Sequence, residues 1–322
     1  MTLRKPPRET PTRAMGRIFL LLLLLALVGV AGWSAVTGQR IDLVEQTRYR
    51  DLELADPVQV GEITINLTLE RPGSPQVVLL HDADVAGSIL WDRVVAEIPD
   101  GYGVARVDLP GFGLSTRMPG PGPGHTIAGM AEAVAGAMAQ RLPGPVLLAG
   151  VGLGGEVAAE IAVSQPEMVS GLIMVDVDFW DEGDWVEIIE GLPWLGRAFT
   201  HTFETGGRFS AGRWAPHCDE GGWCPSVEQI EMRELRQSVE GTTDSVHGFL
   251  ATAQASQVPS RLDQVTVPVV FVRSSKGPVP EESVDRLLGE ELPEMTVVEV
   301  EAWQAHLEAP AEVAAAIEAA AG

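Results

Sequence analysis

The chain has 322 residues and a mass of 34.3 kDa, of which 45% are hydrophobic and 21% charged. This length and composition predict a folded protein with a sizeable core and exclude a disordered chain. Its 22 Lys and Arg residues stand against 45 Asp and Glu residues, a formal net charge of −23. Because nucleic-acid binding needs clustered cations, this balance excludes a general nucleic-acid-binding protein.

The chain begins with a basic segment followed by an apolar one. Residues 1–17 carry five basic side chains and one acidic side chain, and residues 18–37 carry no charge. About 20 apolar residues cross a bilayer as a helix, and a basic flank stays cytoplasmic. We therefore expect a cytoplasmic basic tail over 1–17, a transmembrane signal-anchor helix over 18–37 and a tether over 38–56. The rest of the chain would lie outside the cell membrane. A signal peptide cut after Ala31, which would release a secreted protein, is the alternative.

Beyond the tether, strand-like runs alternate with helical patterns. Strands are predicted over 62–69, 77–80, 104–107, 145–149, 172–177, 267–272 and 295–300. Helices are predicted over 89–98, 126–141, 153–164, 281–288 and 310–320. This alternation indicates an α/β fold with a mostly parallel sheet covered by helices on both faces. We assign its core to residues 57–178 and 264–322.

Residues 179–263 interrupt the alternation and read as helices and loops. An insertion after a strand lies over the crevice where open α/β sheets bind ligands, so we expect a helical lid, or cap. Whether its tryptophans line a pocket or form the core of the lid stays open at this point. The lid holds five of the eight tryptophans in the chain, namely Trp180, Trp185, Trp194, Trp214 and Trp223.

The only two cysteines of the sequence, Cys218 and Cys224, enclose five residues within the lid. In an oxidising compartment we expect them to form a disulfide. Two free thiols or a redox pair are the alternatives. With only His217 nearby as a further ligand, the pair makes a poor zinc site, and we expect neither a metal nor a cofactor.

Four segments carry most of the local information. They are VVLLHDADVAGSILWDRV, VARVDLPGFGLST, VLLAGVGLGGEVAAEIA and VVEVEAWQAHLEAPAEVAAAI. Together, over about residues 57–320, they resemble the α/β-hydrolase fold family in the branch with a helical cap. Epoxide hydrolases, haloperoxidases and many esterases belong to that branch. The resemblance implies a strand–turn–helix elbow that carries a nucleophile within G-x-S-x-G.

At each position that the resemblance assigns to the catalytic triad, this chain has an inert residue. Gly152 stands at the nucleophile position within residues 150–154, and no Ser, Cys or Asp lies near enough to replace it. Gly277 stands where the family acid is expected. Trp303 takes the position of the catalytic histidine, upstream of His306. Because each loss removes a group that the mechanism requires, we expect an inactive protein.

The oxyanion hole of the family uses two backbone N–H groups, which here belong to Ala83 and Leu153. The family has a glycine where this chain has Asp82, and Asp84 follows. A carboxylate beside these donors would satisfy them itself and would disfavour an anionic ligand.

Two other groups of residues could carry chemistry. Asp178 and His306 would form a general base if the fold brought them together. In the alternative interpretation both are structural, with Asp178 capping a helix or turn and His306 packed in the protein or solvated. Residues 150–155 also satisfy G-x-G-x-x-G, with Asp176 following on the next strand, which is typical of dinucleotide sites. The position deep in the chain and the extracytoplasmic compartment argue against a dinucleotide.

We therefore predict a membrane-anchored, extracytoplasmic, non-catalytic binding or scaffolding module. Its partner would be an apolar small molecule or a protein, held in the crevice under the lid. The alternative is an esterase-like or epoxide-hydrolase-like enzyme with a non-standard site at Asp178 and His306. The predicted ligand-contacting residues are Asp82, Ala83, Leu153, Asp178 and Trp303.

Overall fold

A computed structural model describes residues 11–54, 56–179, 192–206, 214–252, 257–292 and 294–321. Its centre is an eight-stranded sheet in the order β1-β2-β4-β3-β5-β6-β7-β8. The strands are β1 (Pro57–Val60), β2 (Ile63–Arg71), β3 (Gln76–Leu80), β4 (Gly103–Val107), β5 (Val146–Val151), β6 (Val169–Val175), β7 (Val269–Ser274) and β8 (Thr296–Val300). β1 and β2 pair antiparallel and β2 meets β4 antiparallel, whereas all later pairs are parallel. The predicted mostly parallel sheet is thus confirmed, with β1 as a strand that the sequence did not indicate.

Both faces of the sheet are buried. In β3, Val78 belongs to one core cluster and Val77 to the other, as expected when alternate side chains point to opposite faces. The helices α3 (Ile127–Arg141) and α4 (Leu153–Ser164) cover the face of Val78. The face of Val77 is covered by α2 (Asp92–Glu97), which follows η2 (Gly87–Trp91), and by α12 (Pro310–Ala320). This double cover explains why β5 is a continuous apolar run, buried at every position.

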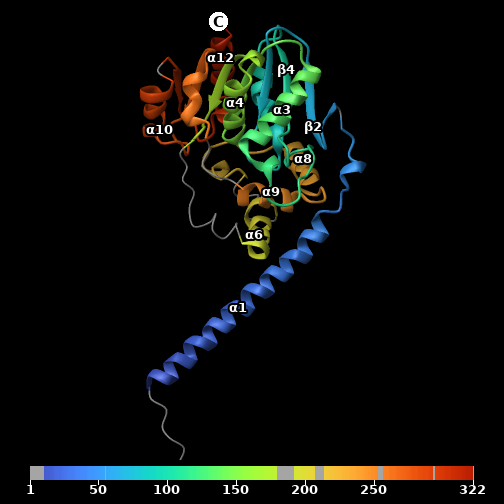
Figure 1. The fold of residues 1–322 in the computed structure, drawn as a ribbon, viewed down its shortest axis with the longest axis vertical. Helices are drawn as coiled ribbons and strands as arrows, with labels where there is room; N and C mark the ends of the chain where they lie inside the picture. Colours follow the sequence, from blue (N-terminus) through green and yellow to red (C-terminus); the bar gives the residue numbers. More distant parts are fainter. Residues whose placement is uncertain are drawn as a thin grey trace, which may run out of the picture.

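The segment between β6 and β7 forms the cap, defined here as the described residues from 192 to 264. It contains α6 (Pro193–Thr200), η5 (His201–Thr205), η6 (Cys218–Glu220), α8 (Val227–Gln237), α9 (Thr242–Thr252) and η7 (Pro259–Gln264). The start of α8 is fixed by a capping box, in which Ser226 and Gln229 bond each other's backbone N–H groups. The remaining elements, η1 (Tyr49–Asp51), η3 (Pro123–His125), η4 (Pro166–Met168), α10 (Glu281–Arg286), η8 (Leu287–Glu291) and α11 (Ala305–Glu308), are short connections. Figure 1 shows the cap at the end of the domain nearest to α1.

A long helix, α1 (Pro11–Val44), projects from the domain (Figure 1). Its stretch Ile18–Val44 contains an 18-residue window with a mean hydropathy of 2.5 and is long and apolar enough to cross a membrane, a test that a signal sequence also passes. The helix continues through residues 38–44, which the sequence analysis assigned to the tether. On this last part, Thr37 and Ile41 are buried, and α1 contacts α6 and η5 of the cap.

The residues after α1 are also fixed to the cap. The Glu45 carboxylate accepts hydrogen bonds from the backbone N–H groups of Gly241 (2.9 Å) and Thr243 (2.7 Å) at the start of α9. Thr47 pairs with Val239 in an isolated parallel bridge. Hydrogen bonds and packing contacts therefore hold the end of the apolar helix against the cap, in addition to the covalent connection.

Candidate functional site

The strand–turn–helix elbow is formed by β5, Gly152 and α4. Gly152 has φ +49° and ψ −119°, in a region that residues with a side chain rarely adopt. The turn is tight, since a Cβ on Gly154 would come within 2.5 Å of the His81 carbonyl oxygen. The backbone of a nucleophile elbow is thus present with glycine at the nucleophile position.

The Asp82 carboxylate occupies the space that a side chain on Gly152 would need. A Cβ added to Gly152 would lie 2.5 Å from Cγ of Asp82 and closer still to its Oδ1. Oδ1 accepts hydrogen bonds from the N–H groups of Ala83 (2.8 Å) and Leu153 (2.9 Å). These are the two donors that the sequence analysis assigned to the oxyanion hole, and an internal carboxylate takes both of them.

The charge on Asp82 is held in an environment of low polarity. Burial raises the pKa of the Asp82 carboxyl, and the nearby charge of Asp84 acts in the same direction. The two hydrogen bonds from Leu153 and Ala83 oppose this effect. The N-terminus of α4, where Leu153 is the first residue, also favours a negative charge.

A second carboxylate, Asp176, follows β6 with a positive φ of 49°. It accepts hydrogen bonds from the Ser274 N–H and hydroxyl, both at 2.6 Å, and from the Ala305 N–H at 3.3 Å. Burial raises its pKa, and the charge of Asp82 raises it further. The negative charge of Asp82 therefore acts on Asp176 within one site. The sequence analysis did not pair Asp176 with Ser274, a residue that it missed.

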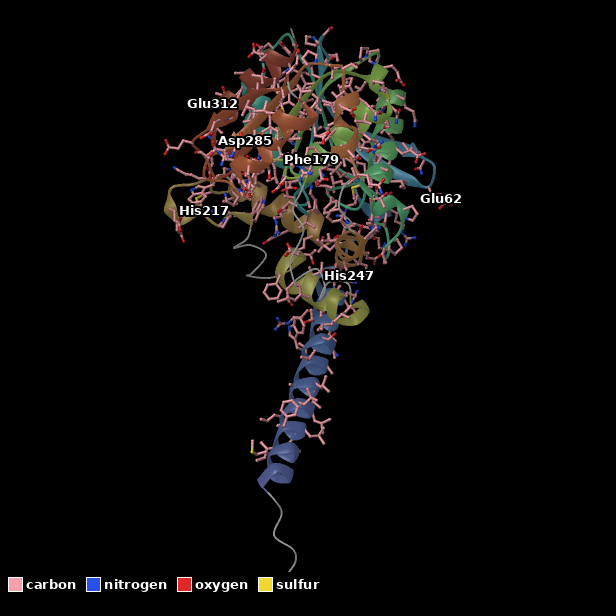
Figure 2. The ribbon with its side chains drawn as sticks, turned by 60° about the vertical axis from the view of Figure 1, so that its left-hand side comes forward. Glu62, Phe179, His217, His247, Asp285 and Glu312 are labelled. Atoms are coloured by element: carbon pink, nitrogen blue, oxygen red, sulfur yellow. A yellow bond between two sulfur atoms is a disulfide. The ribbon has the colours of Figure 1, made fainter. Side chains whose placement is uncertain are left out.

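An aromatic stack fills the position of the family histidine. The ring of Trp303 lies parallel to that of His217, with 3.7 Å between centroids and 10° between planes. The Glu308 carboxylate accepts hydrogen bonds from the backbone N–H of Trp303 (2.8 Å) and from the backbone N–H of Trp223 (3.1 Å). These contacts tie the loop after β8 to the cap. In Figure 2, His217 lies at the left edge of the domain, away from α1. Gly277, at the acid position, lies in a turn in which its N–H donates to the Ser274 carbonyl.

The disulfide between Cys218 and Cys224 is present, with 4.8 Å between the Cα atoms. It closes the short cap loop over residues 218–224, directly after His217. Trp223, inside this loop, packs edge to face on Trp214, with 5.3 Å between ring centroids. Trp180 and Trp185 lie outside the described residues, as does the side chain of Trp194.

Asp178 and His306 are not joined. The Ser283 hydroxyl donates to Asp178 at 3.2 Å. His306 is only 4% exposed and packs against Trp91, and within the described residues neither of its ring nitrogens has a hydrogen-bond partner. Burial lowers the pKa of His306 to about 3, so the ring is neutral at physiological pH.

A cavity of about 510 Å³ lies between the core and the cap. Asp82, Ala83 and Trp303 line it, whereas Leu153 and Asp178 do not. Asp176, Gly277 and His306 also belong to its wall, and the cap contributes Phe203 and Trp214. Across the described parts of the chain, no group of three or more His, Cys, Asp or Glu residues could hold a metal ion.

Comparison with known proteins places this geometry in a family. The profile of the alpha/beta hydrolase family matches residues 77–316. A pimeloyl-[acyl-carrier protein] methyl ester esterase of Sodalis glossinidius is 32% identical over 214 residues, 62% of this chain and 74% of that protein. The same enzyme of Pseudoalteromonas atlantica is 35% identical over 117 residues, and the chain spans only 42% of its length.

A malate-bound thermophilic esterase from Thermogutta terrifontis shares the fold, with a TM-score of 0.63 and 21% identity over 82% of this chain and 97% of that one. The chain described here therefore belongs to the alpha/beta hydrolase family.

Proposed function

We propose that this protein is a non-catalytic member of its family, which binds an apolar small molecule or a protein partner in the cavity under the cap. The observation that carries the proposal is the position of Asp82. Ester hydrolysis in this family needs a nucleophile at the elbow and free N–H donors for the developing oxyanion. Here the elbow residue is Gly152, and the Asp82 carboxylate takes both donors.

The other two triad positions support the same conclusion. Gly277 offers no carboxylate, and Trp303 cannot accept a proton from a nucleophile. The alternative enzyme, with Asp178 and His306 as a general base, lacks a supporting contact between the two. A ring with a pKa of about 3 is also a weak base at neutral pH. The methyl esters named for the relatives are therefore not proposed as substrates of this chain.

We further propose that α1 anchors the domain as a single-pass helix, with the basic tail in the cytoplasm. The hydropathy of residues 18–44 and the positive-inside rule support this orientation. The disulfide supports an oxidising compartment for the cap. Release by cleavage after Ala31 is the alternative, and the mass of the N-terminal peptide from isolated membranes distinguishes the two.

The experiment is a turnover assay of the full chain in detergent micelles. The panel contains short-chain and long-chain nitrophenyl esters and one epoxide, with an active esterase as positive control. We expect no rate above buffer for any of them. Turnover that Asp82→Asn, Asp178→Asn or His306→Ala abolishes would contradict the proposal, because it would assign catalysis to a residue of this site.

A further inference from the structure

We propose that the cavity binds an organic cation, a small molecule with an apolar body and an ammonium group, and that the Asp82 carboxylate is its counter-ion. This inference rests on the proposed binding function and names its ligand class. The sequence analysis expected only that a carboxylate at this point would disfavour an anion. In the structure, the two N–H donors that would hold a developing oxyanion are bonded to the Asp82 carboxylate. The same place in the cavity therefore favours a positive charge.

The two oxygens of Asp82 have different roles. Oδ1 accepts both backbone N–H groups, which fixes the orientation of the carboxylate. Within the described chain, no N–H or O–H group donates to Oδ2. Asp82 lies in the cavity wall, so the surrounding protein raises its pKa while the cavity leaves the carboxylate open to solvent, and Oδ2 is accessible from the cavity. A carboxylate that is held at one oxygen and accessible at the other is preorganised to accept from a donor.

The charges around the cavity leave this site negative. Two cationic side chains belong to the wall, and each lies near another acid. Arg233 is 3.7 Å from Asp84, and Lys276 is 3.1 Å from Glu301. Among the described residues, neither Asp82 nor Asp176 has a Lys or Arg within ion-pair distance. A ligand cation would reduce the repulsion between these two carboxylates, and the acidic surface would attract it over a longer range.

His306 is a buried polar side chain behind the surface of this cavity. It belongs to the wall, is 96% buried, and neither ring nitrogen has a hydrogen-bond partner within the described residues. A buried polar group without a partner lowers stability. Both ring nitrogens are closed to solvent, so a ligand reaches them only if the wall shifts, and the proposal rests on the two carboxylates and the shape of the cavity.

The rest of the wall suits an apolar body. Leu90, Phe203 and Trp303 contribute apolar and aromatic surface to the same wall as the carboxylates. A metal cation fits less well, because the described residues contain no cluster of three metal-binding side chains. An organic anion would meet Asp82 and Asp176 with unfavourable charge. The ligand class that satisfies all these features is an amine with an aromatic or alkyl body.

The test uses three probes with the same ring, namely benzylamine, benzyl alcohol and benzoate. Each is titrated calorimetrically into the full chain in an uncharged detergent at pH 7.5, where benzylamine is cationic. We expect benzylamine to bind at least about tenfold more tightly than benzyl alcohol, as one charge-assisted hydrogen bond allows. Benzoate should bind most weakly.

Two isosteric variants localise the effect. Asp82→Asn should remove most of the preference for amine over alcohol, and Asp176→Asn should reduce it while preserving the residue's positive φ, which asparagine tolerates. Asp100→Asn is the matched control, because this exposed carboxylate lies outside the cavity wall, and it should leave all three affinities unchanged. Thermal unfolding of each variant verifies that it is folded.

Equal affinities for benzylamine and benzyl alcohol would overturn the inference, as would an amine preference that both Asp82→Asn and Asp176→Asn retain. Absence of binding by any probe would overturn it as well. None of these results would restore catalysis, so the non-catalytic proposal would stand. That proposal fails only through turnover in the separate assay.

Discussion

The close approach of Asp82 to Gly152 predicts an energetic coupling between the two positions. Replacing Gly152 by alanine adds a Cβ that would lie 2.5 Å from Cγ of Asp82. The alanine must also adopt φ +49°, and this backbone strain lowers the stability of the folded state by about 1–3 kcal/mol. If Asp82 turns away to make room, its two hydrogen bonds are lost, which adds about 1–3 kcal/mol. We therefore expect Gly152→Ala to destabilise the protein by roughly 2–6 kcal/mol in total.

A double-mutant cycle separates these contributions. In an Asp82→Ala background the overlap is absent, and Gly152→Ala should cost only the backbone strain, about 1–3 kcal/mol. The coupling between the two substitutions should thus be about 1–3 kcal/mol. Urea unfolding followed by tryptophan fluorescence measures all four proteins in the same detergent. Effects that add to within about 0.5 kcal/mol would refute the placement of the carboxylate beside the elbow.

Two further predictions concern His306, which is buried, and Glu45, which is half-buried. His306 has a pKa of about 3 in the folded protein against about 6.5 when unfolded, so the unfolded chain binds more protons between these values. Its contribution to stability is therefore complete above pH 6.5 and should fall by about 1.4 kcal/mol per pH unit below it, and urea unfolding of His306→Phe should lack this component. Glu45→Ala removes the acceptor for the Gly241 and Thr243 N–H groups and should destabilise α9 by about 1–2 kcal/mol. Hydrogen exchange at these two amides should then rise at least about fivefold relative to β5, and unchanged exchange would contradict the anchoring role.

The fold could be predicted largely from local patterns. The continuous apolar run of β5 and the glycines of the following turn specify a buried strand that leads into α4. The positions of Gly152 and Asp82 were also visible, because the resemblance assigns a role to each. β1 was missed because its four residues, PVQV, carry too short a pattern to separate from the preceding polar segment.

The contacts that complete the site could not be predicted, because they join residues far apart in the sequence. Ser274 meets Asp176 across 98 positions, and nothing local marks this serine as a partner for a carboxylate. His217 comes from the cap and Trp303 from the loop after β8, so their stack depends on how the cap is seated. Likewise, the polar composition of residues 38–56 predicts a tether. The contacts of Glu45 with α9 are not visible in the sequence, because Gly241 and Thr243 lie almost 200 positions away.

A cavity without a reactive nucleophile should resist covalent labelling, which can be measured without turnover. The full chain is incubated with a fluorophosphonate, which reports activated serines, and separately with an epoxide, which reports activated carboxylates. Intact mass spectrometry then measures adducts, with the same reagents on a heat-unfolded sample as the background. We predict no adduct above that background for the folded protein. A stoichiometric adduct that maps to Asp82, Asp176 or Ser274 would show a reactive nucleophile in the cavity and contradict the non-catalytic proposal.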